Sequence, residues 1–198
     1  MAHYSEPDLL VLHALRLKGL AEPPAVAEAT AIDPGAVAKQ LTTYEEQGLV
    51  KRRDGKLSGF SLLPTGRQRH AELLAHDRIA AGCDEVIETA YAAFVVHNET
   101  FKQLCTDWQL APGDGTHVAR RLAVLHPEVA SLLEDVAAAM ARFGPYGGRL
   151  ADAADRFAAG DGTALARPLA RSYHDVWMEL HEDFLVTLDR DRSAADGY

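Results

Sequence analysis

The sequence predicts a mostly α protein in two parts, with a small β-hairpin inside the first part. Apolar residues recur at helical spacing along most of the chain. The stretch 50–62 breaks that pattern with a basic run, an Asp54-Gly55 turn and an alternation of apolar and polar residues, which is typical of a hairpin. Charge and pattern both change between residues 78 and 83, so we expect domains over 1–78 and 79–198.

The first part should begin with three helices. A capping box of Ser5 and Asp8 is expected to start the first one. A short second helix is predicted over 24–30, and a third over 34–47 with Asp33 as its N-cap. The order helix, short helix, turn, helix, hairpin is that of a winged helix-turn-helix, which points to DNA binding.

The hairpin and the third helix supply the candidate DNA contacts. The cations flanking the tight turn would reach phosphates, and polar side chains of the third helix would read base edges in the major groove. The predicted set is Pro34, Gly35, Lys39, Gln40, Thr42, Thr43, Lys51, Arg52, Arg53, Lys56 and Ser58. The alternative is a solvated hairpin tip, which alone would be the better interpretation, but the preceding helix favours DNA.

The formal net charge is −9, which is unusual for a DNA-binding protein. The distribution of charge along the chain reconciles this negative total with DNA binding. Basic and acidic residues balance before Ile79, so all of the excess negative charge lies after it, while the run from Lys51 to Arg69 is locally basic. Affinity for DNA depends on the face presented to the phosphates, and the acidic part would lie away from it.

These residues resemble those of the MarR-like winged-helix transcriptional regulators. The resemblance covers about Asp8 to Leu74, through DPGAVAKQLTTYEEQGLVKRR and DGKLSGFSLLPTGR. It implies that the helix over 34–47 enters the major groove and that the hairpin contacts the sugar-phosphate backbone of the DNA. That helix has no Arg, which implies modest sequence specificity or a contribution from the wing. The segments CTDWQ and SYHDVWMELHEDF look like those of an actinobacterial group of two-part regulators with a helical C-terminal domain.

The second part should be a helical bundle. Expected features are a long helix over 83–108, a loop at 111–115, a helix from Thr116 to Leu125 interrupted at His126-Pro127, a helix ending near Phe143, a loop at 144–148, and helices over 149–158 and 168–188, with a frayed tail from residue 190.

Mixed aromatic and polar side chains on two of these helices could line a ligand pocket. The predicted ligand-binding residues are Asn98, Trp108, Tyr173, His174, Trp177 and His181. Core aromatics or a dimer seam would produce the same pattern. From residue spacing alone these alternatives stay open.

Other classes of protein find little support. Histidines 174 and 181 are two helical turns apart, too far to chelate one metal ion, and no activated nucleophile or phosphate-binding glycine loop is visible. We expect no metal, no cofactor, no membrane span, reduced cysteines and a cytoplasmic location. The leading hypothesis is a homodimeric, non-enzymatic transcriptional regulator that binds double-stranded DNA and senses a small-molecule effector. The alternatives are a protein-interaction module using the acidic helical domain, or a small-molecule sequestering protein.

Overall fold

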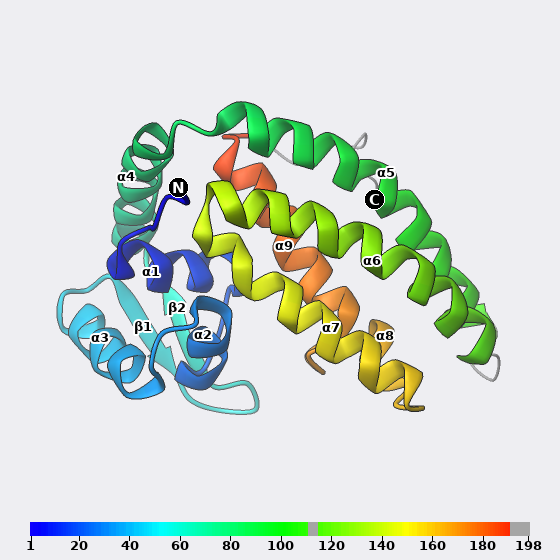
Figure 1. Ribbon diagram of the computed structural model, residues 1–198. Helices are drawn as coiled ribbons and strands as arrows, with labels where there is room; N and C mark the ends of the chain where they lie inside the picture. Colours follow the sequence, from blue (N-terminus) through cyan, green and yellow to red (C-terminus); the bar gives the residue numbers. More distant parts are fainter. Residues whose placement is uncertain (111–114, 191–198) are drawn as a thin grey trace. The chain divides into compact units, whose positions relative to one another are not determined.

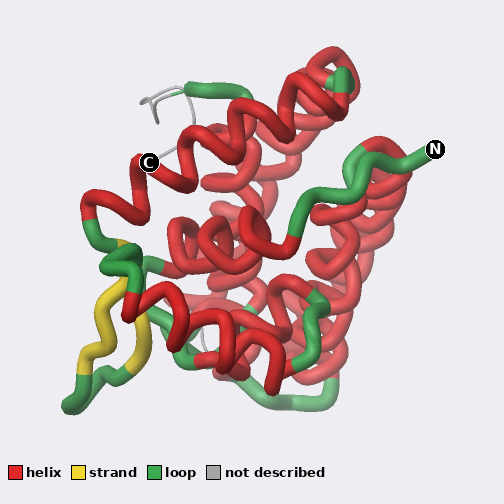
Figure 2. The backbone as a smooth tube through the Cα atoms, turned by 90° about the vertical axis from the view of Figure 1, so that its left-hand side faces the viewer, coloured by secondary structure: helices red, strands yellow, loops and turns green. Residues whose placement is uncertain are grey.

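The computed structural model describes residues 1–110 and 115–190, and these are mostly helical with one small two-stranded antiparallel sheet (Figure 1). The expected fold class is confirmed at this level. In Figure 2 the strands are the short yellow pair and nearly all other regular structure is helix. The loop expected at 111–115 falls almost wholly outside the described residues, and so does the tail beyond residue 190.

The chain divides into two compact units. The N-terminal unit comprises Ala2–Gly82 together with a short later segment, Met140–Pro145. The C-terminal unit comprises Cys83–Ala139 and the chain from Tyr146 onward. The later segment belongs to the N-terminal unit because it pairs with the start of the chain, and spacing along the sequence does not reveal such pairing between distant residues.

The N-terminal unit has the expected element order. Its elements are α1 (Pro7–Lys18), α2 (Pro23–Thr30), α3 (Pro34–Glu46), β1 (Val50–Arg53), β2 (Gly59–Leu62) and α4 (Pro64–Ala81). The two strands pair with Val50 opposite Leu62 and Arg53 opposite Gly59. The core lies between α1, α2, α3 and the hairpin, and contains Val11, Leu12, Leu15, Val26, Val37, Leu41, Val50 and Phe60.

Helix capping differs between α1 and α3. Asp33 caps α3 as predicted, because its Oδ1 accepts the backbone N–H of Ala36 at 2.9 Å. The capping box predicted for α1 is wrong, since Glu6 is the N-cap residue and makes no side-chain capping bond. The Ser5 hydroxyl instead donates to the nearly buried carboxylate of Asp77 at 2.8 Å. A buried carboxylate without hydrogen-bond donors costs more free energy than an exposed helix end without a side-chain cap, so Ser5 bonds Asp77.

The C-terminal unit is helical throughout most of its described residues. Its helices are α5 (Asp84–Leu110), α6 (Gly115–Ala139), α7 (Gly144–Ala158), α8 (Thr163–Ala166) and α9 (Tyr173–Thr187). The short 3-10 turn η1 (Ala141–Phe143) comes between α6 and α7 in the chain but belongs to the N-terminal unit. α5 and α6 pack along one another (Figure 1).

Two predicted breaks in the second part are wrong. α6 continues through Pro127, although proline removes one backbone hydrogen bond. Its buried stripe continues on both sides of the proline, and this burial offsets the loss; the stripe consists of Val118, Leu122, Leu125, Val129, Leu133 and Val136. The glycine-rich stretch 144–148 begins α7 rather than a loop, because Pro145 fits a first turn and Tyr146 opens the helix's own buried stripe.

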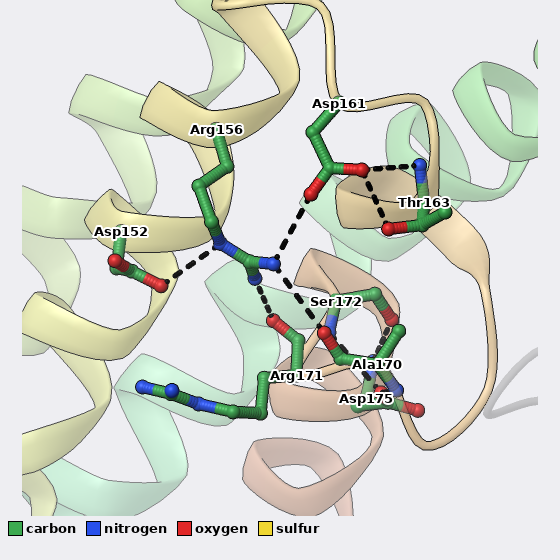
Figure 3. Close-up of polar contacts among 8 residues, drawn as sticks. All are labelled: Asp152, Arg156, Asp161, Thr163, Ala170, Arg171, Ser172 and Asp175. Carbon is green, nitrogen blue, oxygen red and sulfur yellow. Dashed lines mark hydrogen bonds and ion pairs between the residues drawn. The ribbon is translucent and has the colours of Figure 1, made fainter.

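The last helix starts at Tyr173, later than the expected Pro168, and the segment before it is held from two sides (Figure 3). Ser172 and Asp175 form a capping box. The Asp175 carboxylate also accepts the backbone N–H groups of Leu169 and Ala170 at 3.2 and 3.0 Å, while the Arg156 guanidinium donates to the carbonyls of Ala170 and Arg171. These bonds replace helical ones, so residues 168–172 stay outside α9.

None of the helices within the described residues is long and apolar enough to cross a membrane.

Candidate nucleic-acid interface

The outward face of α3 carries most of the DNA-contacting residues predicted for that helix. Pro34, Gly35, Lys39, Thr42 and Thr43 are all exposed. The hydroxyls of the two threonines donate back to carbonyls one turn earlier in the helix, Ala38 and Lys39, at 3.1 and 3.2 Å. Such bonds leave the methyl group and the oxygen lone pairs accessible, which are the features a thymine methyl or a base donor could meet.

Gln40 lies at the edge of this face and is half-buried. Its side-chain amide donates to Asp8 Oδ1 and to the Tyr44 hydroxyl, both at 2.7 Å. The Tyr44 hydroxyl in turn donates to the backbone carbonyl of Asp8 at 3.3 Å, and burial raises the pKa of Tyr44 far above its usual range, so it stays neutral. Gln40 therefore joins α3 to α1, a contact that helical periodicity did not reveal.

The hairpin separates its cations by strand alternation. Val50 is buried, so Arg52 lies on the same side of β1 as Val50, while Lys51 and Arg53 lie on the other side.

The Arg52 guanidinium lies 5.3 Å from the centroid of the ring of Phe60, its cross-strand partner. Its nitrogens also lie 3.1 Å from Asp54 Oδ1 and 3.6 Å from Glu22 Oε2. Arg52 is thus held within the unit from three directions.

The remaining predicted wing residues face outward. Lys51, Arg53, Lys56 and Ser58 are exposed. Within residues 1–110 and 115–190, none of these three cations makes an ion pair. An uncompensated cation on an exposed strand or turn can neutralise a phosphate without first breaking an internal contact. Of the four predicted wing cations, Lys51, Arg53 and Lys56 are therefore available to bind an anion, whereas Arg52 is engaged in contacts within the unit.

A short third strand position supports the hairpin and was missed from the sequence. Ala21 pairs with Phe60 in both directions, through N–H···O bonds of 3.1 and 2.8 Å. The close approach requires Gly59, which has a φ of +140° and whose Cβ, if present, would lie 2.6 Å from the carbonyl carbon of Ala21. Gly59 was the sequence signal for a close backbone approach, although nothing in the residue spacing pointed to Ala21 as the partner.

The predicted ligand-binding residues fall into two groups in the C-terminal unit. Asn98, Tyr173, Trp177 and His181 are buried. The Trp177 indole N–H donates to Asn98 Oδ1 at 2.8 Å, and its ring packs 4.6 Å from Phe94 and 4.7 Å from Phe101, centroid to centroid. The four predicted residues are brought together in an interlocked aromatic core, with the indole hydrogen bond satisfied inside it.

Trp108 and His174 are half-exposed, unlike the other four. Trp108 meets Phe157 edge to face at a centroid distance of 5.2 Å and lies close against Gly162. His174 packs near Phe101, at 6.2 Å, and burial lowers its pKa below the usual value. Ligand binding by the six residues stays a prediction, and these two are the members whose surfaces are accessible.

The chain's other chemistry-bearing residues form no recognisable centre in the part that is described. No group of three or more His, Cys, Asp or Glu side chains there could hold a metal ion. Burial raises the pKa of the Cys105 thiol to about 12, which leaves it protonated and unreactive at neutral pH.

Comparisons of the chain with protein-family models, with curated proteins and with solved structures found no match.

Proposed function

We propose that the N-terminal unit is a winged-helix DNA-binding domain and that the protein is a MarR-like transcriptional regulator. The observation that carries the proposal is the pairing of Ala21 with β2. With it, the element order becomes helix, strand position, helix, helix, strand, strand. In this arrangement an exposed helix, α3, precedes a hairpin whose outward cations are uncompensated within the described residues.

The physical basis is electrostatic and geometric. An α-helix fits the major groove of duplex DNA, and base edges there are read by side chains such as Lys39, Thr42 and Thr43. Lys51, Arg53 and Lys56 would lie along the phosphates and release counterions. The negative charge of the whole chain does not oppose this, because the excess belongs to residues after Ile79.

Two parts of the proposal concern partners. A homodimer would double the base contacts of a single winged helix and match a two-fold symmetric operator. A small-molecule effector would bind the C-terminal unit and change DNA affinity by as much as it prefers one DNA-binding state over the other. Trp108 and His174, which are half-exposed, are the residues we assign to first contact with such a molecule.

The test is duplex binding as a function of salt. Fluorescence anisotropy with labelled DNA from the protein's own promoter region, and with a scrambled duplex, should give an affinity that falls steeply as salt rises. Lys51→Ala with Arg53→Ala should weaken it, while Arg120→Ala, an exposed arginine of α6, should not. Absence of salt-dependent binding to either duplex would refute the proposal and favour the protein-interaction alternative.

A further inference from the structure

The segment Met140–Phe143 is built into the N-terminal unit although it comes far later in the chain. Met140 pairs with His3 in a parallel bridge, and the Ala141 N–H donates to the His3 carbonyl at 2.9 Å. Met140 and Phe143 are 1% and 0% exposed, and Arg142 is 7% exposed. The segment is therefore buried and paired through its backbone with the start of the chain. We call Met140–Phe143 the latch.

A buried polar chain fixes the latch. Arg142 Nη1 lies 3.0 Å from His13 Nε2 in α1, and His13 Nδ1 lies 2.9 Å from His70 Nε2 in α4. The two imidazoles stack with centroids 5.1 Å apart. An arginine can only donate, so His13 Nε2 accepts, His13 Nδ1 carries the proton and donates, and His70 Nε2 accepts.

This proton arrangement requires both imidazoles to be neutral. A proton on His13 Nε2 would remove the acceptor for Arg142 and place two cations side by side, with nitrogens 3.0 Å apart. A proton on His70 Nε2 would set two N–H donors against each other. Histidine in an unfolded chain takes up a proton near pH ~6.5, so acidification favours states in which the latch is released.

The charged and titratable groups of the elements around the two rings are mostly at the surface. On α4, Asp77 is buried and is engaged by His3 at 2.6 Å and by Ser5. The other such groups of α4 and α1 are exposed or half-exposed, and they are Arg67, Arg69, Glu72, His76, Arg78, Asp8, Arg16 and Lys18. The η1 residue bonded to His13 is Arg142, and its positive charge opposes protonation of that ring.

The latch is connected to α3 through α1. His13, which accepts the Arg142 hydrogen bond, and Asp8, which accepts the Gln40 amide, belong to the same helix. A shift of α1 on release of the latch would therefore act on the Gln40 and Tyr44 contacts that place α3.

We propose that Met140–Phe143 is a pH-sensitive latch, which stays bound to α1 while His13 and His70 are neutral. Protonation of these histidines releases the latch and displaces α1, so that α3 loses the position it needs to bind DNA. The effect on DNA rests on the function proposed above, whereas docking of the latch does not.

The first measurement is hydrogen exchange of the full-length protein at pH 7.5 and 5.5, corrected for intrinsic rates. The reporter is the Ala141 amide, which is protected only when it is bonded to His3. We expect its protection to fall about tenfold or more at pH 5.5, in line with loss of a charged buried hydrogen bond. Equal protection at the two pH values in the wild-type protein would overturn the proposal without any variant.

Variants then assign the effect to the two histidines. In His13→Gln with His70→Gln, glutamine carbonyl oxygens can accept the same hydrogen bonds but cannot be protonated, so protection should stay unchanged at pH 5.5. The matched control is His76→Gln, an exposed histidine of α4, which should behave as wild type. If the double variant fails to fold, Arg142→Lys, which keeps the charge but loses the guanidinium fork, should show reduced protection already at pH 7.5.

Duplex affinity measured on the same samples separates the two proposals. DNA binding that weakens at pH 5.5 in wild type but not in the double histidine variant supports the whole chain of inference. Loss of Ala141 protection with no duplex binding at either pH would refute the DNA-binding function and leave the latch. Duplex binding and Ala141 protection that are both independent of pH would refute the latch and leave the function.

Discussion

The guanidinium of Arg52 lies over the ring of Phe60, 5.3 Å from its centroid, on the side of the hairpin that carries buried Val50. This contact, together with Asp54 and Glu22, makes Arg52 part of the hairpin's internal structure. Lys51 and Arg53, one position to either side, face the other way. A run of three basic residues therefore splits into two roles by the twofold periodicity of a strand.

Exchanging the outward cations for alanine should weaken DNA binding. In Lys51→Ala with Arg53→Ala, the slope of log affinity against log salt should become shallower by about 0.9 for each phosphate that is no longer neutralised. Arg52→Ala should leave that slope nearly unchanged and lower the free energy of unfolding by about 0.5–1 kcal/mol, because the cation–π interaction with Phe60 is removed. Anisotropy titrations and urea denaturation measure the two effects. A larger slope change for Arg52→Ala than for the Lys51→Ala, Arg53→Ala double variant would contradict this division.

Gln40→Ala should reduce stability rather than change base preference. The amide hydrogens that adenine recognition would need are both donated inside the unit, to Asp8 and Tyr44. We expect a loss of about 1 kcal/mol in the free energy of unfolding. Thr42→Ala, on the exposed face, should instead alter the sequences recovered from a random duplex pool. Recovery of a changed motif for Gln40→Ala alone would show that Gln40 reads DNA directly.

Gly59→Ala should destabilise the protein far more than Gly55→Ala. Both glycines have positive φ, +140° and +145°, so both substitutions carry backbone strain of about 1–3 kcal/mol. Only at residue 59 would the new Cβ meet another backbone, 2.6 Å from Ala21, whereas nothing lies within 4 Å at residue 55. Thermal unfolding of the two variants isolates the steric effect. Equal melting temperatures would mean that Ala21 and β2 are not paired in solution.

Trp177→Ala should be strongly destabilising, by about 3–5 kcal/mol, because it removes a buried indole from the aromatic core. Trp108→Ala, at a half-exposed position, should cost much less, and it should reduce the rise in melting temperature caused by any effector. A thermal-shift screen of metabolites on the wild type and both variants measures both effects. A near-normal melting temperature for Trp177→Ala, with loss of a ligand-induced shift, would instead identify Trp177 as a pocket residue.

The two cysteines should differ in reactivity. Cys105 is buried and its pKa is raised to about 12, so the thiolate that reacts with iodoacetamide is scarce in the folded state at pH 8. Cys83 is half-buried and should be labelled faster. Mass spectrometry of native and urea-unfolded samples distinguishes the sites. Equal labelling rates in the native protein would show that the α5 core opens readily.

The order and type of the elements in the first part followed from local signals. Asp33 and Pro34 mark the start of α3, and Asp54-Gly55 lies in the connection between β1 and β2; such signals act within a few residues, so the sequence alone carries them. The same local reasoning failed at Pro127 and at 144–148. There the local preference for a break is opposed by burial of a continuous apolar stripe, which only the packed bundle supplies.

The sequence by itself determined that this protein is mostly helical with one basic hairpin, because hydrophobic period and turn chemistry are local. Tertiary structure alone decided which polar side chains are already engaged in contacts within the protein. Gln40, Arg52 and Asn98 each looked available in the pattern, yet each finds its partner far away in the chain, at Asp8, Glu22 and Trp177. The latch is the extreme case, since Arg142 and His13 are 129 positions apart. Contacts between distant residues depend on how the chain is folded, and no spacing along the sequence records them.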